Sequence, residues 1–139
     1  MLHKLSIGIC LTLLILSLGA CSKKTDFALS AVVPAARGFV TVKTDKNENY
    51  VIKVSITDLA EPDRLQPPHQ TYVVWLVTEL NLTKNIGQLK SSTGSVNKQL
   101  KASFKAVSPY NPVKVFVTAE NDPVTQYPSD LVVLSTEEF

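Results

Sequence analysis

Alternation of apolar and polar residues dominates the chain after residue 36 and predicts β-strands. In residues 50–57, Ile52, Val54 and Ile56 fall on one face, and the residues between them are mostly polar. A period of two is typical of a half-buried strand. A similar run at residues 39–43 comes before it, and the polar residues 45–49 separate the two. This arrangement predicts an antiparallel hairpin.

Further short strands follow at regular intervals. Residues 71–78 are apolar on both faces, which predicts a central strand buried on both sides with Trp75 as the largest side chain of the core. Proline-bearing residues 58–70 predict a loop with one short helical turn at residues 62–65. The remaining expected strands are 27–33, 86–90, 98–105, 113–119 and 131–134.

The sequence contains no amphipathic helix long enough for a parallel crossover. The expected fold is therefore all-β, an antiparallel immunoglobulin-like β-sandwich of about seven strands. The outward positions of several strands carry lysines, which discourage association between sheet edges.

The first twenty residues differ in character from the rest. His3 and Lys4 precede a largely apolar run that ends at Leu18, and small residues follow. This layout is typical of a secretory signal peptide, and the run is shorter than the ~20 apolar residues that span a bilayer. We expect a cleaved signal peptide over residues 1–20; an uncleaved signal anchor is the alternative.

Leu18-Gly19-Ala20-Cys21 resembles a bacterial lipobox. The resemblance implies cleavage between Ala20 and Cys21 and acylation of Cys21, and several acyl chains on one residue anchor a protein stably. An aspartate directly after the lipidated cysteine retains a lipoprotein on the inner membrane. Here that residue is Ser22, so the expected location is the outer membrane, facing the periplasm. We expect residues 21–36 to form an anchored tether with the possible edge strand, and residues 37–139 to form the sandwich.

Charge and cysteine content narrow the classes of function. The chain has 14 basic and 12 acidic residues, and its lysines are spread along the sequence. Nucleic-acid binding usually requires a concentrated basic patch, so we do not expect it. The two cysteines are Cys10, in the leader, and Cys21. The mature domain therefore has no cysteine for a disulfide bond, a metal thiolate or a nucleophile.

Candidate catalytic and metal-binding residues are few. His69 is the single histidine after the leader, whereas a zinc site needs three or four nitrogen or sulfur ligands. We interpret it as a loop histidine at the entry of the following strand. Residues 120–122, with Asp45 or Glu48, offer oxygen atoms but lack a calcium-loop pattern. We expect no enzyme activity, cofactor or metal.

Several segments together resemble the extracytoplasmic domain of anti-sigma-K factors. They are residues 38–59, 71–76 (TYVVWL), 87–89 (GQL), 115–120 (VFVTAE) and 122–133, which include Tyr127-Pro128-Ser129. The resemblance implies a β-sandwich on the outer side of a membrane. In that family the domain follows a transmembrane helix and a cytoplasmic segment that binds the sigma factor, and neither occurs in this sequence. The resemblance therefore implies the fold of this domain but not the sigma-binding activity.

These observations predict a non-enzymatic, lipid-anchored binding or sensing module of the cell envelope. Its expected partners are the membrane, through acyl chains on Cys21, and another envelope protein, with contacts made by loops and a sheet edge. The alternative is small-ligand or glycan binding at one end of the sandwich, by Tyr110, Asn111, Gln126 and Tyr127.

Overall fold

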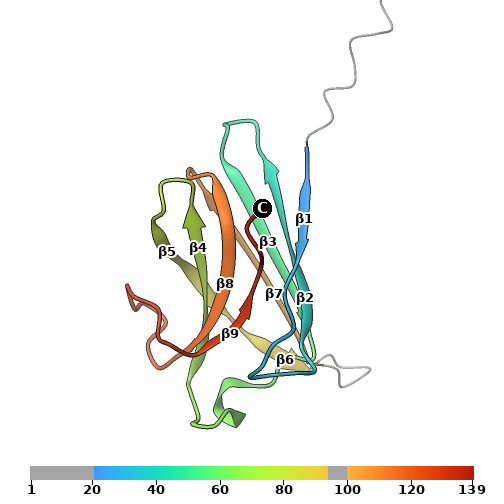
Figure 1. Ribbon diagram of the computed structural model, residues 1–139, viewed down its shortest axis with the longest axis vertical. Helices are drawn as coiled ribbons and strands as arrows, with labels where there is room; N and C mark the ends of the chain where they lie inside the picture. The colour runs from blue at the N-terminus through green and yellow to red at the C-terminus, as the bar shows by residue number, and fades with distance from the viewer. Residues whose placement is uncertain (1–20, 94–99) are drawn as a thin grey trace, which may run out of the picture.

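Two antiparallel sheets face each other in the computed structural model, which describes residues 21–93 and 100–139 (Figure 1). One short 3₁₀ helix, η1, lies between the third and fourth strands. The elements are β1 Lys23–Asp26, β2 Arg37–Thr44, β3 Tyr50–Thr57, η1 Pro62–Arg64, β4 Thr71–Thr78, β5 Thr83–Leu89, β6 Ser91–Thr93, β7 Leu100–Ser108, β8 Pro112–Glu120 and β9 Val132–Ser135.

The strand order is that of an immunoglobulin-like sandwich. The first sheet has the order β1-β2-β3-β7-β6, and the second has the order β5-β4-β8-β9. If β2 to β9 are taken as strands A, B, C, C′, D, E, F and G, these orders are ABED, with β1 added outside A, and C′CFG. The predicted fold class is confirmed. The described residues form nine strands rather than about seven, because β1 and β6 were not foreseen.

The predicted alternation of buried and exposed residues is confirmed in the first sheet. Arg37 pairs with Thr57 and Thr44 with Tyr50 across the β2–β3 hairpin, without a bulge. Most side chains that face the second sheet are buried, with Phe104 and Ala106 half-buried, and those between them are half-buried or exposed. The strands of this sheet contribute Val40, Val42, Ile52, Val54, Ile56 and Ala102 to the core.

The segment after Cys21 differs from the expected tether. Strand β1 begins at Lys23 and pairs along β2, whereas residues 28–33 lie outside any strand. Phe27 makes a single bridge with Thr136, and the Ser30 hydroxyl donates a hydrogen bond of 2.5 Å to the Val133 carbonyl oxygen. The expected strand at residues 27–33 is therefore wrong, and this segment instead covers the open edge of β9.

The other expected boundaries shift by a few residues. Strand β5 begins at Thr83 rather than at residue 86, and β6 lies between the strands expected at residues 86–90 and 98–105. Strand β7 begins at Leu100, and the expected strand residues 98–99 lie outside the described residues. The helical turn predicted at residues 62–65 is confirmed by η1.

Strand β4 is buried on both faces, as predicted, but Trp75 does not lie in the core between the sheets. Tyr72, Val74 and Leu76 belong to that core. Trp75 alternates with them, so it lies on the outer face of the second sheet, where it is completely buried. Its burial was predicted correctly, and its position was not.

The chain enters the sandwich at one end, and the longest described loops lie at the other (Figure 1). Cys21 is near the β2–β3 turn and the last residue, Phe139, with which it lines a small cavity. The β3–β4 loop and the start of the β8–β9 loop lie at the opposite end. Within residues 21–93 and 100–139, no helix has the length and apolar character needed to cross a membrane.

Candidate functional site

A buried chain of hydrogen bonds runs along the outer face of the second sheet and ends in the β8–β9 loop. Trp75 Nε1 donates to Thr118 Oγ1 (2.8 Å), and that hydroxyl donates to Glu120 Oε1 (2.6 Å). The same carboxylate oxygen accepts a bond from the Ser129 backbone N–H (2.8 Å). The Phe116 ring stacks beside Trp75, with centroids 6.2 Å apart. The Thr118 and Glu120 side chains are both buried and hydrogen-bonded, and this fixes the start of the β8–β9 loop.

Asn85 fixes the middle of the same loop from the other side. Its side-chain Nδ2 donates to the Pro123 carbonyl (3.0 Å) and to the Thr125 carbonyl (2.9 Å). Asn85 is the β5 partner of Trp75, and Phe116 is the β8 partner. The β8–β9 loop therefore lies over the outer face of the second sheet at the position of Trp75, which explains how this residue is buried there.

A bulge in β5 places the Asn85 side chain for this contact. The pairing shifts between Val74 and Trp75, so that Val74 pairs with Gly87 and Trp75 with Asn85. Gly87 has φ of +142°, and its N–H donates to Asn85 Oδ1 (3.0 Å). A Cβ atom at position 87 would lie 2.7 Å from Phe104 Cε2. Only glycine fits this bulge without strain.

The loop and β5 enclose an open groove of about 740 Å³, lined by residues 83–88 and 123–126. Beside it, Val124 and Tyr127 are 77% and 81% exposed, although the loop that carries them is hydrogen-bonded at both Asn85 and Glu120. We call this groove with Val124 and Tyr127 the loop surface. It combines a hydrogen-bonded backbone with an exposed tyrosine, a residue type enriched among those that dominate the energetics of protein interfaces.

A second open groove of about 550 Å³ lies at the end of the sandwich that carries η1. Its lining is more polar and includes Glu61, Asp63, His69, Gln70 and Lys90. This combination of carboxylates, an imidazole, an amide and an ammonium group can bind a polar ligand by hydrogen bonds. We call it the polar groove.

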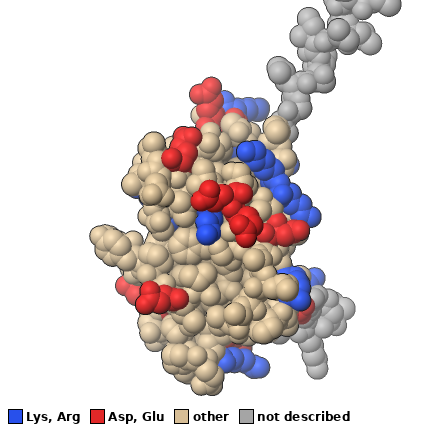
Figure 2. All heavy atoms as spheres, viewed as in Figure 1, with Lys and Arg blue, Asp and Glu red and all other residues tan. Residues whose placement is uncertain are grey.

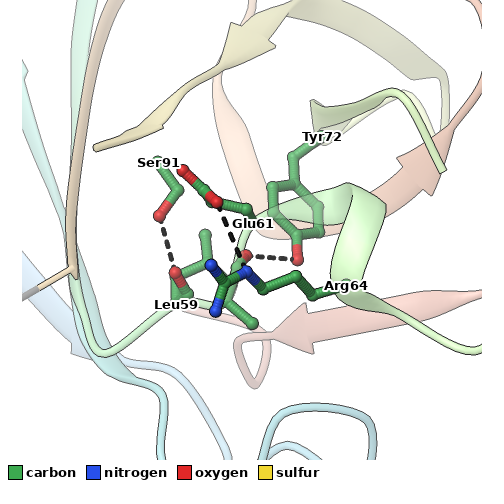
Figure 3. Close-up of polar contacts among 6 residues, drawn as sticks. Leu59, Glu61, Arg64, Tyr72 and Ser91 are labelled. Carbon is green, nitrogen blue, oxygen red and sulfur yellow. Dashed lines mark hydrogen bonds and ion pairs between the residues drawn. The ribbon is translucent and has the colours of Figure 1, made fainter. Parts of the chain in front are cut away.

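The β3–β4 loop beside the polar groove is held by one side chain from each sheet (Figure 3). The Tyr72 hydroxyl donates to the Ala60 carbonyl (2.7 Å), and the Ser91 hydroxyl donates to the Leu59 carbonyl (2.6 Å). Arg64 and Glu61 form an exposed ion pair of 3.5 Å. Burial raises the pKa of the Tyr72 phenol, and the nearby Asp63 carboxylate adds to the increase.

His69 lies at the entry of β4, as predicted. Its backbone N–H donates to the Pro62 carbonyl (2.9 Å), and its Nδ1 lies 2.8 Å from the Pro67 carbonyl oxygen. Because a carbonyl only accepts, Nδ1 is the donor in this contact, which leaves Nε2 free of it. The histidine thus forms part of the loop and offers one nitrogen for binding.

The oxygen-bearing residues 120–122 do not share a site with the turn that contains Asp45 and Glu48. Glu120 is buried in the Trp75 network, whereas Asp45 Oδ1 accepts the N–H groups of Asn47 and Asn49 in the β2–β3 turn at the other end of the sandwich. Among the described residues, no group of three or more His, Cys, Asp or Glu side chains is placed to hold a metal ion.

The aromatic and amide residues proposed for ligand binding are also separated. Tyr110 and Asn111 precede β8, and Gln126 and Tyr127 follow it. A nine-residue strand between them is about 30 Å long. The four residues therefore cannot contact one small ligand.

The predicted anchor position is accessible. Cys21 is exposed and carries a free thiol, two residues before β1. Ala20 and the rest of the predicted signal peptide lie outside the described residues.

The roles of Asn85, Gly87 and Thr118 in this site were not recognised from the sequence. Their sequence signals are weak: a glycine within a strand pattern, which marks a bulge, and a polar residue opposite an apolar one.

Comparison with models of protein families, with curated proteins and with solved structures finds no match to this chain.

Proposed function

We propose that this protein is a non-enzymatic, lipid-anchored module of the bacterial cell envelope that binds another protein through its loop surface. The observation that supports this most directly is the 81% exposure of Tyr127 on a loop whose backbone is hydrogen-bonded to Asn85 and Glu120. A side chain displayed by a rigid loop loses little conformational freedom when a partner covers it. Aromatic residues are also the commonest anchors of protein interfaces.

The position of Cys21 agrees with this proposal. The thiol is exposed and lies at the end of the sandwich opposite the start of the β8–β9 loop. Acyl chains on Cys21 would leave the loop surface free to meet a partner in the periplasm. Ser22, in place of an aspartate after Cys21, favours the outer membrane as the site of attachment. From the resemblance to the anti-sigma-K extracytoplasmic domain, we further propose that this contact reports on the state of the envelope.

The anchor is tested by Cys21→Ser in cells. We expect the wild-type protein to sediment with the envelope and the variant to appear in the soluble fraction or to accumulate with its leader uncut. Full retention of a cleaved Cys21→Ser protein in the envelope would contradict the anchor.

The contact is tested by a photo-crosslinking amino acid at position 127, with position 80 as the matched control. Leu80 is also well exposed, at 68%, but it lies in the β4–β5 turn at the other end of β4. We expect a discrete crosslinked product from position 127 and none from position 80. Identical crosslinking patterns from both positions, or none from either, would contradict the proposal.

A small polar ligand or glycan in the polar groove is the second candidate. Its volume of about 550 Å³ falls within the ~300–1,000 Å³ of typical ligand sites. Thermal-shift screening against envelope sugars and small metabolites tests it, with Asp63→Asn and Gln70→Ala as variants that remove groove contacts. No shift by any compound, or an equal shift in the variants, would remove this candidate.

A further inference from the structure

Strand register gathers lysines that are spread along the sequence onto one surface. On the outer face of the first sheet, opposite residues of neighbouring strands share a side. Lys24 pairs with Thr41, Thr41 with Lys53, and Lys53 with Lys105, so three lysines form one row across four strands. We call this outer surface the lysine face. Its cations are Lys24, Arg37, Lys43, Lys53, Lys101 and Lys105.

Like charges face each other on this surface. Lys53 and Lys105 are directly opposite each other, an arrangement that disfavours folding. The ion pair between Arg64 and Glu61 lies in the β3–β4 loop, outside this face. Asp26 is the acidic residue within the face, and Asp58 lies at its border where β3 ends. Six cations against these two carboxylates give the face a net positive charge, which attracts anionic groups.

Apolar side chains lie between the cations. Lys24 Nζ is 4.2 Å from the centre of the half-buried Phe39 ring. Val51 and Val107 are opposite each other in the row beside Lys53, and Val107 is 57% exposed. Lysines that surround exposed apolar groups suit a lipid headgroup region, because their ammonium groups reach phosphates while the apolar groups face the acyl boundary.

We propose that the lysine face binds the phosphate headgroups of anionic lipids. This proposal depends on the proposed anchor only for which membrane is bound. Cys21 lies two residues before β1, the edge strand of this same sheet. A protein tethered there can lay the first sheet on the membrane. The loop surface, on the outer side of the second sheet, then points away from the bilayer.

Vesicle sedimentation of the Cys21→Ser chain without residues 1–20 tests the face separately from the anchor, because this chain retains all nine described strands. The probes are phosphatidylcholine vesicles with and without phosphatidylglycerol. We expect binding only to the anionic vesicles, and loss of binding as salt shortens the Debye length to about 8 Å. Each lysine near an anionic surface contributes about fivefold to binding.

The test variant is Lys24→Gln with Lys53→Gln and Lys105→Gln, for which we expect a loss on the order of 100-fold. The matched control is Lys84→Gln with Lys90→Gln and Lys114→Gln, which removes the same charge from residues outside the face. Circular dichroism and the thermal midpoint establish that both variants fold. We expect the test variant to be at least as stable as wild type, since it removes the Lys53–Lys105 repulsion.

Three outcomes would overturn the proposal: equal binding to both kinds of vesicle, equal loss in the test and control variants, or binding to a soluble polyanion such as heparin or DNA without binding to anionic vesicles. The last would reassign the face to a polymer. None of these results bears on the anchor, which the chain in this assay lacks and which Cys21→Ser tests in cells.

Discussion

Asn85→Ala is expected to release the β8–β9 loop from the second sheet while leaving the sandwich folded. The substitution removes three hydrogen bonds, to the Pro123 and Thr125 carbonyls and from the Gly87 N–H. A net hydrogen bond contributes about 1 kcal/mol, and water replaces the exposed bond to Pro123 at little cost. The bond from Gly87 lies within β5 and does not hold the loop, so the expected loss is about 1 kcal/mol for opening of the loop, or about fivefold in its opening constant.

Trp75 reports this opening directly, because it is the single tryptophan of the chain and is fully buried beneath the loop. We expect Asn85→Ala to shift its emission to longer wavelength and to raise its quenching by acrylamide. Amide hydrogen exchange in residues 121–131 is expected to quicken by a similar factor, while exchange in β3 and β7 stays slow.

Asn111→Ala is the matched control. Asn111 also makes an exposed side-chain hydrogen bond, to Glu79 Oε2 (3.1 Å), but it precedes β8 at the other end of the strand. We expect a change within ~0.5 kcal/mol and unchanged Trp75 emission. If Asn85→Ala folds normally and leaves both the quenching of Trp75 and exchange in the loop unchanged, the reasoning that the loop is fixed through Asn85 is wrong.

Substitutions at three further positions test the packing around the site. Gly87→Ala is expected to destabilise by about 1–3 kcal/mol in urea unfolding, because φ at this position is positive and the new Cβ meets the Phe104 ring; a neutral result would contradict the bulge geometry. Thr118→Val keeps the side-chain shape but leaves the buried Trp75 N–H without an acceptor, so we expect a loss of about 1–3 kcal/mol, and a smaller loss in Thr118→Ser, by the same measurement. The folded state keeps the Tyr72 phenol protonated above its ordinary pKa of 10.0, so its contribution to stability is complete below about pH 10 and falls as pH rises above that value. Tyr72→Phe should be less stable near neutral pH, since it loses the bond to the Ala60 carbonyl, and its stability should decline less steeply as pH rises above 10. An equally steep decline in the variant would mean that groups other than Tyr72 cause the loss of stability.

The strand pattern was predictable because alternation depends on residues close together in the chain. Ile52, Val54 and Ile56 face the core as their spacing indicates, and the apolar run of β4 is buried on both sides. The position of β1 was not predictable, since Lys23 and Lys24 read as a solvated tether. Their pairing with β2 is a contact between distant segments, which a local pattern does not encode.

The candidate site was largely outside the reach of sequence reasoning. Asn85 acts on Pro123 and Thr125, 38 and 40 residues away, and nothing in its neighbours marks it. Trp75 was recognised as a buried residue, but the face on which it lies depends on whether a loop returns over the sheet. The lysine face is a similar case, because Lys53 and Lys105 become neighbours only through the β3–β7 register.

The two outer faces of the sandwich are built in different ways. The second sheet is apolar on its outer side around Trp75, so it needs the β8–β9 loop as a cover, and that cover presents Tyr127. The first sheet has exposed lysines on its outer side, so this face is hydrated unless an anionic partner approaches. On the side of the molecule seen in Figure 1, charges of both signs are mixed (Figure 2). If Cys21 carries the proposed anchor, the arrangement that brings the lysine face near a membrane would also turn the loop surface away from it, because Cys21 lies two residues before β1.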